Sequence, residues 1–92
     1  MKMEISELRT KIDSLDREIV RLLVERMGVS AEVAAYKIAN GLPVLDKTRE
    51  AALLQKIASL SGDMGDYTHA IYLEILKQSR AYQDALISKS AK

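Results

Sequence analysis

The first part of the chain carries one long apolar stripe, and this feature constrains the fold more than any other. Apolar residues recur three and four positions apart at Ile5, Leu8, Ile12, Leu15, Ile19 and Leu22. This alternation places them on one face of an α-helix, and the spacing continues to Tyr36 without a proline. Gly28 costs such a helix roughly 1 kcal/mol relative to alanine, which contacts along the stripe can offset. We therefore predict one helix over about residues 4–39, ended by Asn40-Gly41.

A helix of this length cannot be covered by one copy of a 92-residue chain. At 1.5 Å per residue, about 36 residues extend ~54 Å, whereas a small domain is about 30 Å across. The outer half would expose its apolar stripe to water unless a second copy covered it. The chain has no cysteine, so disulfides cannot stabilise its small core. We therefore predict an intertwined homodimer.

Two shorter amphipathic segments follow the long one. Asp46 can cap the first of them, and apolar residues at helical spacing mark both. We predict helices over about residues 46–60 and 67–87, a turn at 62–66 and a frayed end at 88–92. The predicted fold is therefore all-α, with three helices in a single domain over residues 1–92.

Composition excludes several classes of function. The 14 Lys+Arg and 13 Asp+Glu residues give a formal charge of +1, so no sequence-wide field attracts nucleic acid or an anionic membrane. Near its start the chain has two acids, Glu4 and Glu7, where a signal peptide would have an apolar run, so a cytoplasmic location is expected. No apolar stretch approaches membrane-spanning length. With no cysteine and one histidine, His69, the chain lacks the parts for a thiolate or histidine metal site or a catalytic triad.

Arg26 interrupts the apolar stripe at a position where every preceding member is Ile or Leu. A guanidinium there needs an anion. It can extend its head to solvent or pair with a nearby acid. Lys37, three helical turns on, leaves the same face, so both cations can close on one ligand with Val33 as an apolar wall between them.

Arg9 is a second early cation, directly beside the stripe residue Leu8. On a continuous helix the 17 residues between Arg9 and Arg26 correspond to about 25 Å along the axis, too far for both side chains of one chain to hold a small molecule. If Arg9 serves the same site, it comes from the partner chain. The alternative is a surface arginine paired with Asp13 in the next turn.

Polar residues also mark the two later helices. Asp46, Arg49 and Glu50 share one side of the first turn of the second helix. Capping and the helix dipole alone can explain Asp46, and Glu50 can offset Arg49 or Arg26. Ser79 and Gln83 lie four residues apart in or beside the apolar row of the third helix, where the alternative to a binding role is a helix-to-helix hydrogen bond.

Together these positions are recognisable as a set. They are Leu8-Arg9, Ile12-Asp13, Glu25-Arg26, Val33, Tyr36-Lys37, Pro43-Val44, Asp46-Lys47-Thr48-Arg49-Glu50 and Ser79-Arg80-Ala81-Tyr82-Gln83. The set resembles the all-helical chorismate mutases, from about Ile5 to Leu86. Its strength lies in the order of the polar positions, because each motif alone is weak. The resemblance implies a site formed between two intertwined chains, with one arginine crossing from the partner.

The resemblance implies how the two carboxylates of chorismate are bound. Arg26 and the Arg9 contributed by the partner chain would grip them, with Ser79 and Arg49 helping to place them. An arginine fork matches carboxylate geometry.

The resemblance also implies how the rest of the substrate is held. Lys37 and Gln83 would donate to the ether oxygen of the breaking bond, while Glu50 and the backbone at Asp46 would hold the ring hydroxyl. A pericyclic rearrangement to prephenate needs no nucleophile, metal, cofactor or proton transfer, so cations and amides are sufficient.

Val33 and Leu76 would form the apolar walls around the ring. Leu76 replaces the isoleucine expected from the resemblance, and Met27-Gly28 stands where a more polar pair is common.

Two other functions are compatible with the sequence. An isochorismate pyruvate lyase of the same fold shares the cations, but a carboxylate such as Glu50 belongs to the mutase pattern. The other is a non-catalytic helical dimerisation or regulatory module.

Overall fold

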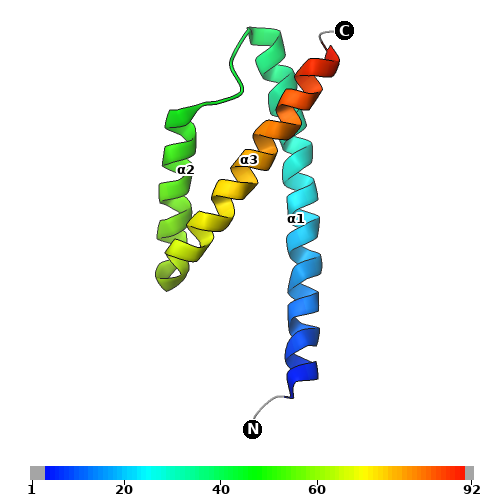
Figure 1. Ribbon diagram of the computed structural model, residues 1–92, viewed down its shortest axis with the longest axis vertical. Helices are drawn as coiled ribbons and strands as arrows, with labels where there is room; N and C mark the ends of the chain where they lie inside the picture. The colour runs from blue at the N-terminus through cyan, green and yellow to red at the C-terminus, as the bar shows by residue number, and fades with distance from the viewer. Residues whose placement is uncertain (1–3, 91–92) are drawn as a thin grey trace.

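The structure, a computed structural model, describes residues 4–90 and is all-helical in this part of the chain (Figure 1). Its elements are α1 (Ile5–Asn40), α2 (Lys47–Leu60), the short 3₁₀ helix η1 (Gly62–Met64) and α3 (Gly65–Ser90). The predicted fold class with three α-helices is confirmed. The terminal residues of the predicted domain, 1–3 and 91–92, lie outside the described residues.

The long helix α1 ends where the sequence predicts. Gly41 has a φ of 63°, a left-handed conformation that glycine adopts without steric cost. The N–H of Leu42 donates to the carbonyl of Lys37 at 2.9 Å, which satisfies one of the last carbonyls of the helix. The end of α1 is thus fixed by local sequence.

Asp46 caps α2, as predicted. Its side-chain Oδ1 accepts the backbone N–H of Arg49 at 3.0 Å, and its carbonyl accepts the N–H of Glu50. The side-chain bond satisfies an N–H group that has no partner within the first turn, and the bond to the Asp46 carbonyl is the first i→i−4 bond of the helix. They also fix the first turn of α2, where Arg49 and Glu50 lie.

The third helix is longer than predicted at both ends. The segment expected to be a turn forms η1 and the start of α3. There the chain packs closely on the end of α2, because a Cβ on Gly65 would lie 3.2 Å from the carbonyl oxygen of Ala58. A hydrogen bond of 2.6 Å from Thr68 Oγ1 to Ser61 Oγ joins α3 to the C-cap residue of α2. At the other end α3 continues to Ser90, so the predicted fraying of 88–90 is wrong; no glycine or proline stops the helix there.

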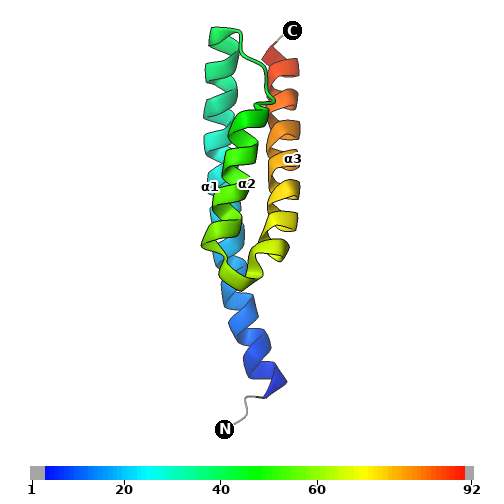
Figure 2. The same cartoon turned by 90° about the vertical axis from the view of Figure 1, so that its left-hand side faces the viewer.

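The helix α3 joins the other two elements. It contacts both α1 and α2, whereas no Cα of α1 lies within 8 Å of a Cα of α2 in the described chain. The described part is long and flat, with extents of 59 × 27 × 14 Å. Figures 1 and 2 show the N-terminal half of α1 extending beyond both other helices. The C-terminal half of α1 alone faces the rest of the chain.

The buried interior is very small and unusually polar. Among the described residues, the buried side chains are Ser30, Ala34, Leu76, Ser79 and Gln83. Every residue from 4 to 25 is exposed, including the whole apolar stripe of that region. One copy of the chain therefore leaves most of its large apolar side chains in contact with water.

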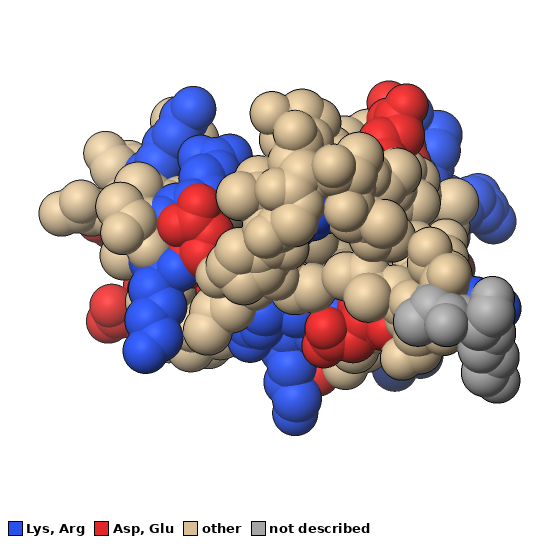
Figure 3. Space-filling view, turned by 90° about the horizontal axis from the view of Figure 1, so that it is seen from above, with Lys and Arg blue, Asp and Glu red and all other residues tan. Residues whose placement is uncertain are grey.

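The surface is mixed in charge. On the face seen in Figure 3, basic and acidic side chains are interspersed, so this face carries no broad basic patch of the kind that binds nucleic acid. No helix within residues 4–90 combines the length and the hydrophobicity needed to cross a membrane.

Candidate active site

A cavity of about 310 Å³ lies among the C-terminal half of α1, the start of α2 and the middle of α3. Its lining residues are Arg26, Val29, Ser30, Val33, Lys37, Val44, Asp46, Arg49, Glu50, Leu53, Leu76, Ser79, Arg80 and Gln83. Nine of the ten site residues that the sequence suggests are among them. Residues far apart in sequence thus border one space because α3 joins α1 to α2.

Arg9 is the predicted site residue that does not line this cavity. It is exposed in the N-terminal part of α1, 17 residues before Arg26 on the same continuous helix. In the described chain it makes no ion pair with Asp13, the alternative partner considered from sequence. Within one chain, therefore, Arg9 does not line the cavity and does not form the ion pair with Asp13.

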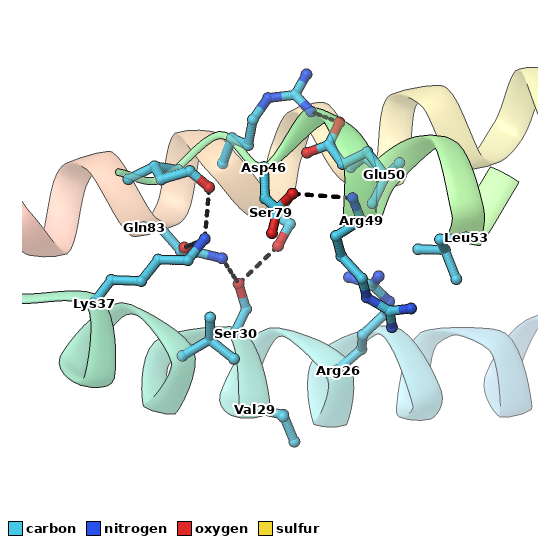
Figure 4. Close-up of a pocket in the computed structure, with 14 residues that line it drawn as sticks. Arg26, Val29, Ser30, Lys37, Asp46, Arg49, Glu50, Leu53, Ser79 and Gln83 are labelled. Carbon is cyan, nitrogen blue, oxygen red and sulfur yellow. Dashed lines mark hydrogen bonds and ion pairs between the residues drawn. The ribbon is translucent and has the colours of Figure 1, made fainter. Parts of the chain in front are cut away.

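Three cations border the cavity without a carboxylate partner in residues 4–90: Arg26, Lys37 and Arg49. The side chains of Arg26 and Arg49 extend toward one another across the space between α1 and α2 (Figure 4). Lys37 Nζ donates to the carbonyl of Val44 at 2.5 Å and to Gln83 Oε1 at 3.4 Å. Unneutralised guanidinium and ammonium groups beside apolar walls favour an anionic ligand.

A buried hydrogen-bond network crosses from α3 to α1. Gln83 Nε2 donates to Ser30 Oγ at 2.9 Å, and Ser30 Oγ lies 2.7 Å from Ser79 Oγ. The three residues are only 5–7% exposed, and no buried side-chain polar atom in the described chain lacks a partner. The helix-to-helix hydrogen bond considered for Gln83 is therefore present, and it uses one of the two N–H groups of the amide.

Ser30 was missed from the sequence, although a signal was available. Together with Arg26, Val33 and Lys37 it continues the four-three-four spacing of the α1 stripe, so it faces the same cavity. A serine at such a position needs a partner when buried, and Gln83 and Ser79 are its partners. The sequence also gave no role to the apolar lining residues Val29, Val44 and Leu53.

Glu50 pairs with Arg80, a residue to which the sequence assigns no role. Arg80 Nη1 donates to Glu50 Oε1, forming an ion pair between α3 and α2. The partners considered from sequence, Arg49 and Arg26, make no ion pair with Glu50 in the described chain. The other lining carboxylate, Asp46, is used as the cap of α2.

The arrangement has donors in excess and few acceptors. Cations, hydroxyls and an amide surround an apolar floor formed by Leu76 and Val33, and the glutamate is already paired. Fixed donors of this kind bind carboxylates and stabilise negative charge that develops on an oxygen. The cavity therefore suits a small anionic ligand with an apolar part.

The sequence of this chain matches a known protein family. Residues 8–84 match the family described as chorismate mutase type II. This chain belongs to the chorismate mutase type II family. The matched span includes all ten site residues suggested by the sequence, from Arg9 to Gln83.

Curated relatives carry related names. The chain is 31% identical over 83 residues to the T-protein of Haemophilus influenzae, covering 87% of this chain and 22% of that protein. It is 32% identical over 85 residues to the bifunctional chorismate mutase/prephenate dehydratase of Escherichia coli, covering 89% of this chain and 22% of that protein. It is 35% identical over 57 residues to the chorismate mutase of Methanocaldococcus jannaschii, covering 62% of this chain and 58% of that protein. The chorismate mutase type II chain thus spans about a fifth of the length of the T-protein and the bifunctional relative.

Proposed function

We propose that this chain is a chorismate mutase, which converts chorismate to prephenate in one pericyclic step. The ether C–O bond breaks as a C–C bond forms, so the product is an isomer of the substrate and no group leaves. The observation that carries the proposal is the set of three unpaired cations, Arg26, Lys37 and Arg49, around an apolar cavity. Such a site matches a dianion that rearranges without a nucleophile.

The carboxylates of chorismate would be bound by Arg26 and Arg49, with the hydroxyl of Ser79 as a further donor. Ser30 Oγ can donate to Ser79 Oγ, which leaves the Ser79 hydroxyl hydrogen for a carboxylate oxygen. The fourth contact would be Arg9 of a second copy of this chain. The Arg9 on the same chain as the cavity lies about 25 Å from Arg26 along α1, too far to reach the substrate.

The ether oxygen would receive donors from Lys37 and Gln83. Lys37 has three N–H groups, of which two are directed to Val44 and Gln83. Gln83 has a second N–H beyond the one directed to Ser30. Each residue therefore retains one donor for negative charge that grows on the ether oxygen in the transition state.

The ring would lie against Val33 and Leu76, with its hydroxyl held by Glu50 and by the backbone at Asp46. Holding the flexible enolpyruvyl group of chorismate over the ring adds a contribution from orientation to the electrostatic stabilisation. A rate acceleration of ~10⁶ corresponds to about 8 kcal/mol, which fixed charges and orientation together can supply.

We also propose that the domain works as an intertwined homodimer. The exposed stripe between Ile5 and Leu22 supports this, because isolated chains of this size do not keep so much contiguous apolar surface in water. A second copy would cover the stripe and bring its own Arg9 to the cavity.

The direct test is to incubate the purified protein with chorismate and to identify the product. Loss of the ultraviolet absorbance of chorismate with formation of prephenate is expected. Release of pyruvate from isochorismate would instead identify a lyase. No turnover of either compound by a folded, dimeric protein would make the chain a non-catalytic module and overturn the proposal.

A further inference from the structure

The ion pair between Arg80 and Glu50 has no assigned role in the proposed reaction. It joins α3 to α2 at the wall of the cavity, with the Arg80 side chain 31% exposed and the Glu50 side chain 22% exposed. Arg80 contacts Oε1 of Glu50, and Oε2 makes no hydrogen bond to the described residues. One carboxylate oxygen of Glu50 is therefore held by Arg80, while the other is left for a ligand.

The charges around the cavity show why this pairing matters. Its lining includes four cations, Arg26, Lys37, Arg49 and Arg80, and two carboxylates, Asp46 and Glu50. Asp46 is used to cap α2. Glu50 is the carboxylate that remains, and it borders the same cavity as the cations proposed to bind the substrate. Without Arg80, Glu50 would be an unpaired carboxylate on the wall of a cavity that also holds those cations.

We propose that Arg80 is a positioning residue that keeps Glu50 from neutralising the substrate-binding cations. Its proposed effect is exerted through Glu50, the carboxylate with which it pairs. By holding Oε1, Arg80 directs the carboxylate toward α3 and leaves Arg26 and Arg49 without an internal anion. This inference rests on the proposed function, since it assigns the ring hydroxyl to Glu50 and the substrate carboxylates to the cations.

This role differs from that of an ordinary interhelical ion pair in one measurable way. A structural pair contributes to stability, and removing either partner has a similar effect. An ordinary ion pair shows coupling between its partners in the free energy of unfolding, whereas in the proposed role the coupling appears in KM, because the damage from losing Arg80 depends on whether Glu50 still carries a charge. Removing Arg80 alone frees a competing carboxylate, whereas removing both charges frees none.

The experiment is a double-mutant cycle of Arg80→Met, Glu50→Gln and the double variant, with KM and kcat for chorismate measured at fixed ionic strength. Arg80→Met should raise KM about tenfold, because the freed carboxylate competes with the substrate. In the Glu50→Gln background the same substitution should change KM by less than about twofold. Arg80→Lys keeps the charge and should restore most of the wild-type KM.

Lys77→Met is the matched control, since Lys77 is an exposed cation on α3 that does not line the cavity; it should leave KM unchanged. Circular dichroism checks folding, and Arg80→Gln replaces Arg80→Met if the latter does not fold. Equal KM effects of Arg80→Met in both backgrounds, with an active wild type, would overturn the inference alone. A wild type that does not convert chorismate would overturn the proposed function and this inference with it.

Discussion

The two halves of α1 share one helix and one spacing but differ in what surrounds them. From residue 5 to residue 25 every side chain is exposed, whereas from Arg26 onward the helix buries Ser30 and Ala34 and borders the cavity. The stripe is Ile and Leu in the first half and includes Arg26, Ser30 and Lys37 in the second. Periodicity therefore identifies the face that a helix presents for contact, and composition distinguishes an apolar stripe from a face that also carries polar and charged groups.

A charge introduced into the N-terminal stripe should have the largest effect on assembly and activity. Leu15 is 61% exposed in one chain, so Leu15→Glu would be harmless to a monomer. If a second copy covers the stripe, the buried carboxylate should prevent dimerisation and abolish measurable turnover. Analytical ultracentrifugation and the chorismate assay measure both, with the exposed Lys11→Glu as the control. A fully active Leu15→Glu protein would remove the proposed difference between the two halves.

In the C-terminal half, Arg26→Met should separate activity from stability. We expect kcat/KM to fall about 10³-fold, the size of effect seen when a fixed donor to an anion is lost. The free energy of unfolding should not decrease, because an unpaired cation beside apolar side chains costs free energy in the absence of ligand. Urea unfolding and steady-state kinetics test this. A large loss of stability with unchanged turnover would make Arg26 a structural residue.

A smaller effect is expected from Gln83→Glu, and it should depend on pH. The introduced carboxyl donates only while protonated, and its carboxylate would pair with Lys37, whose Nζ already lies 3.4 Å from Gln83 Oε1. Above the pKa of this carboxyl, kcat/KM should fall by up to about tenfold per pH unit, while the wild-type profile stays nearly flat. Gln83→Ala should be slow at every pH. Identical wild-type and Gln83→Glu profiles would show that Gln83 does not face the ether oxygen.

Local sequence was sufficient to predict most of the helices and their boundaries. The stripe and Asn40-Gly41 predicted α1 within one residue at each end, and Asp46 predicted the start of α2. The start of α3 was missed because residues 62–66 have the composition of a turn. At the start of α3, Gly65 lies so close to Ala58 that a side chain would be crowded, and this contact between elements is not encoded in local composition.

The site was predicted less evenly. The resemblance named nine of the residues around the cavity, and the spacing of α1 contained enough information to add Ser30. Arg80 has no comparable signal. Its partner Glu50 lies 30 residues earlier on another helix, so the pair exists only through the packing of α3 on α2. Which acid neutralises which cation is a tertiary property.

The most direct test of the account is subunit complementation between Arg9→Ala and Arg26→Ala chains. Each variant alone should be nearly inactive, because every site then lacks one arginine. After the chains exchange, each heterodimer contains one site with both arginines, so an equimolar mixture should recover about a quarter of the wild-type activity. Native mass spectrometry measures the exchange. Recovery at this level would place Arg9 of one chain at the cavity of the other, and no recovery despite demonstrated exchange would contradict the shared site.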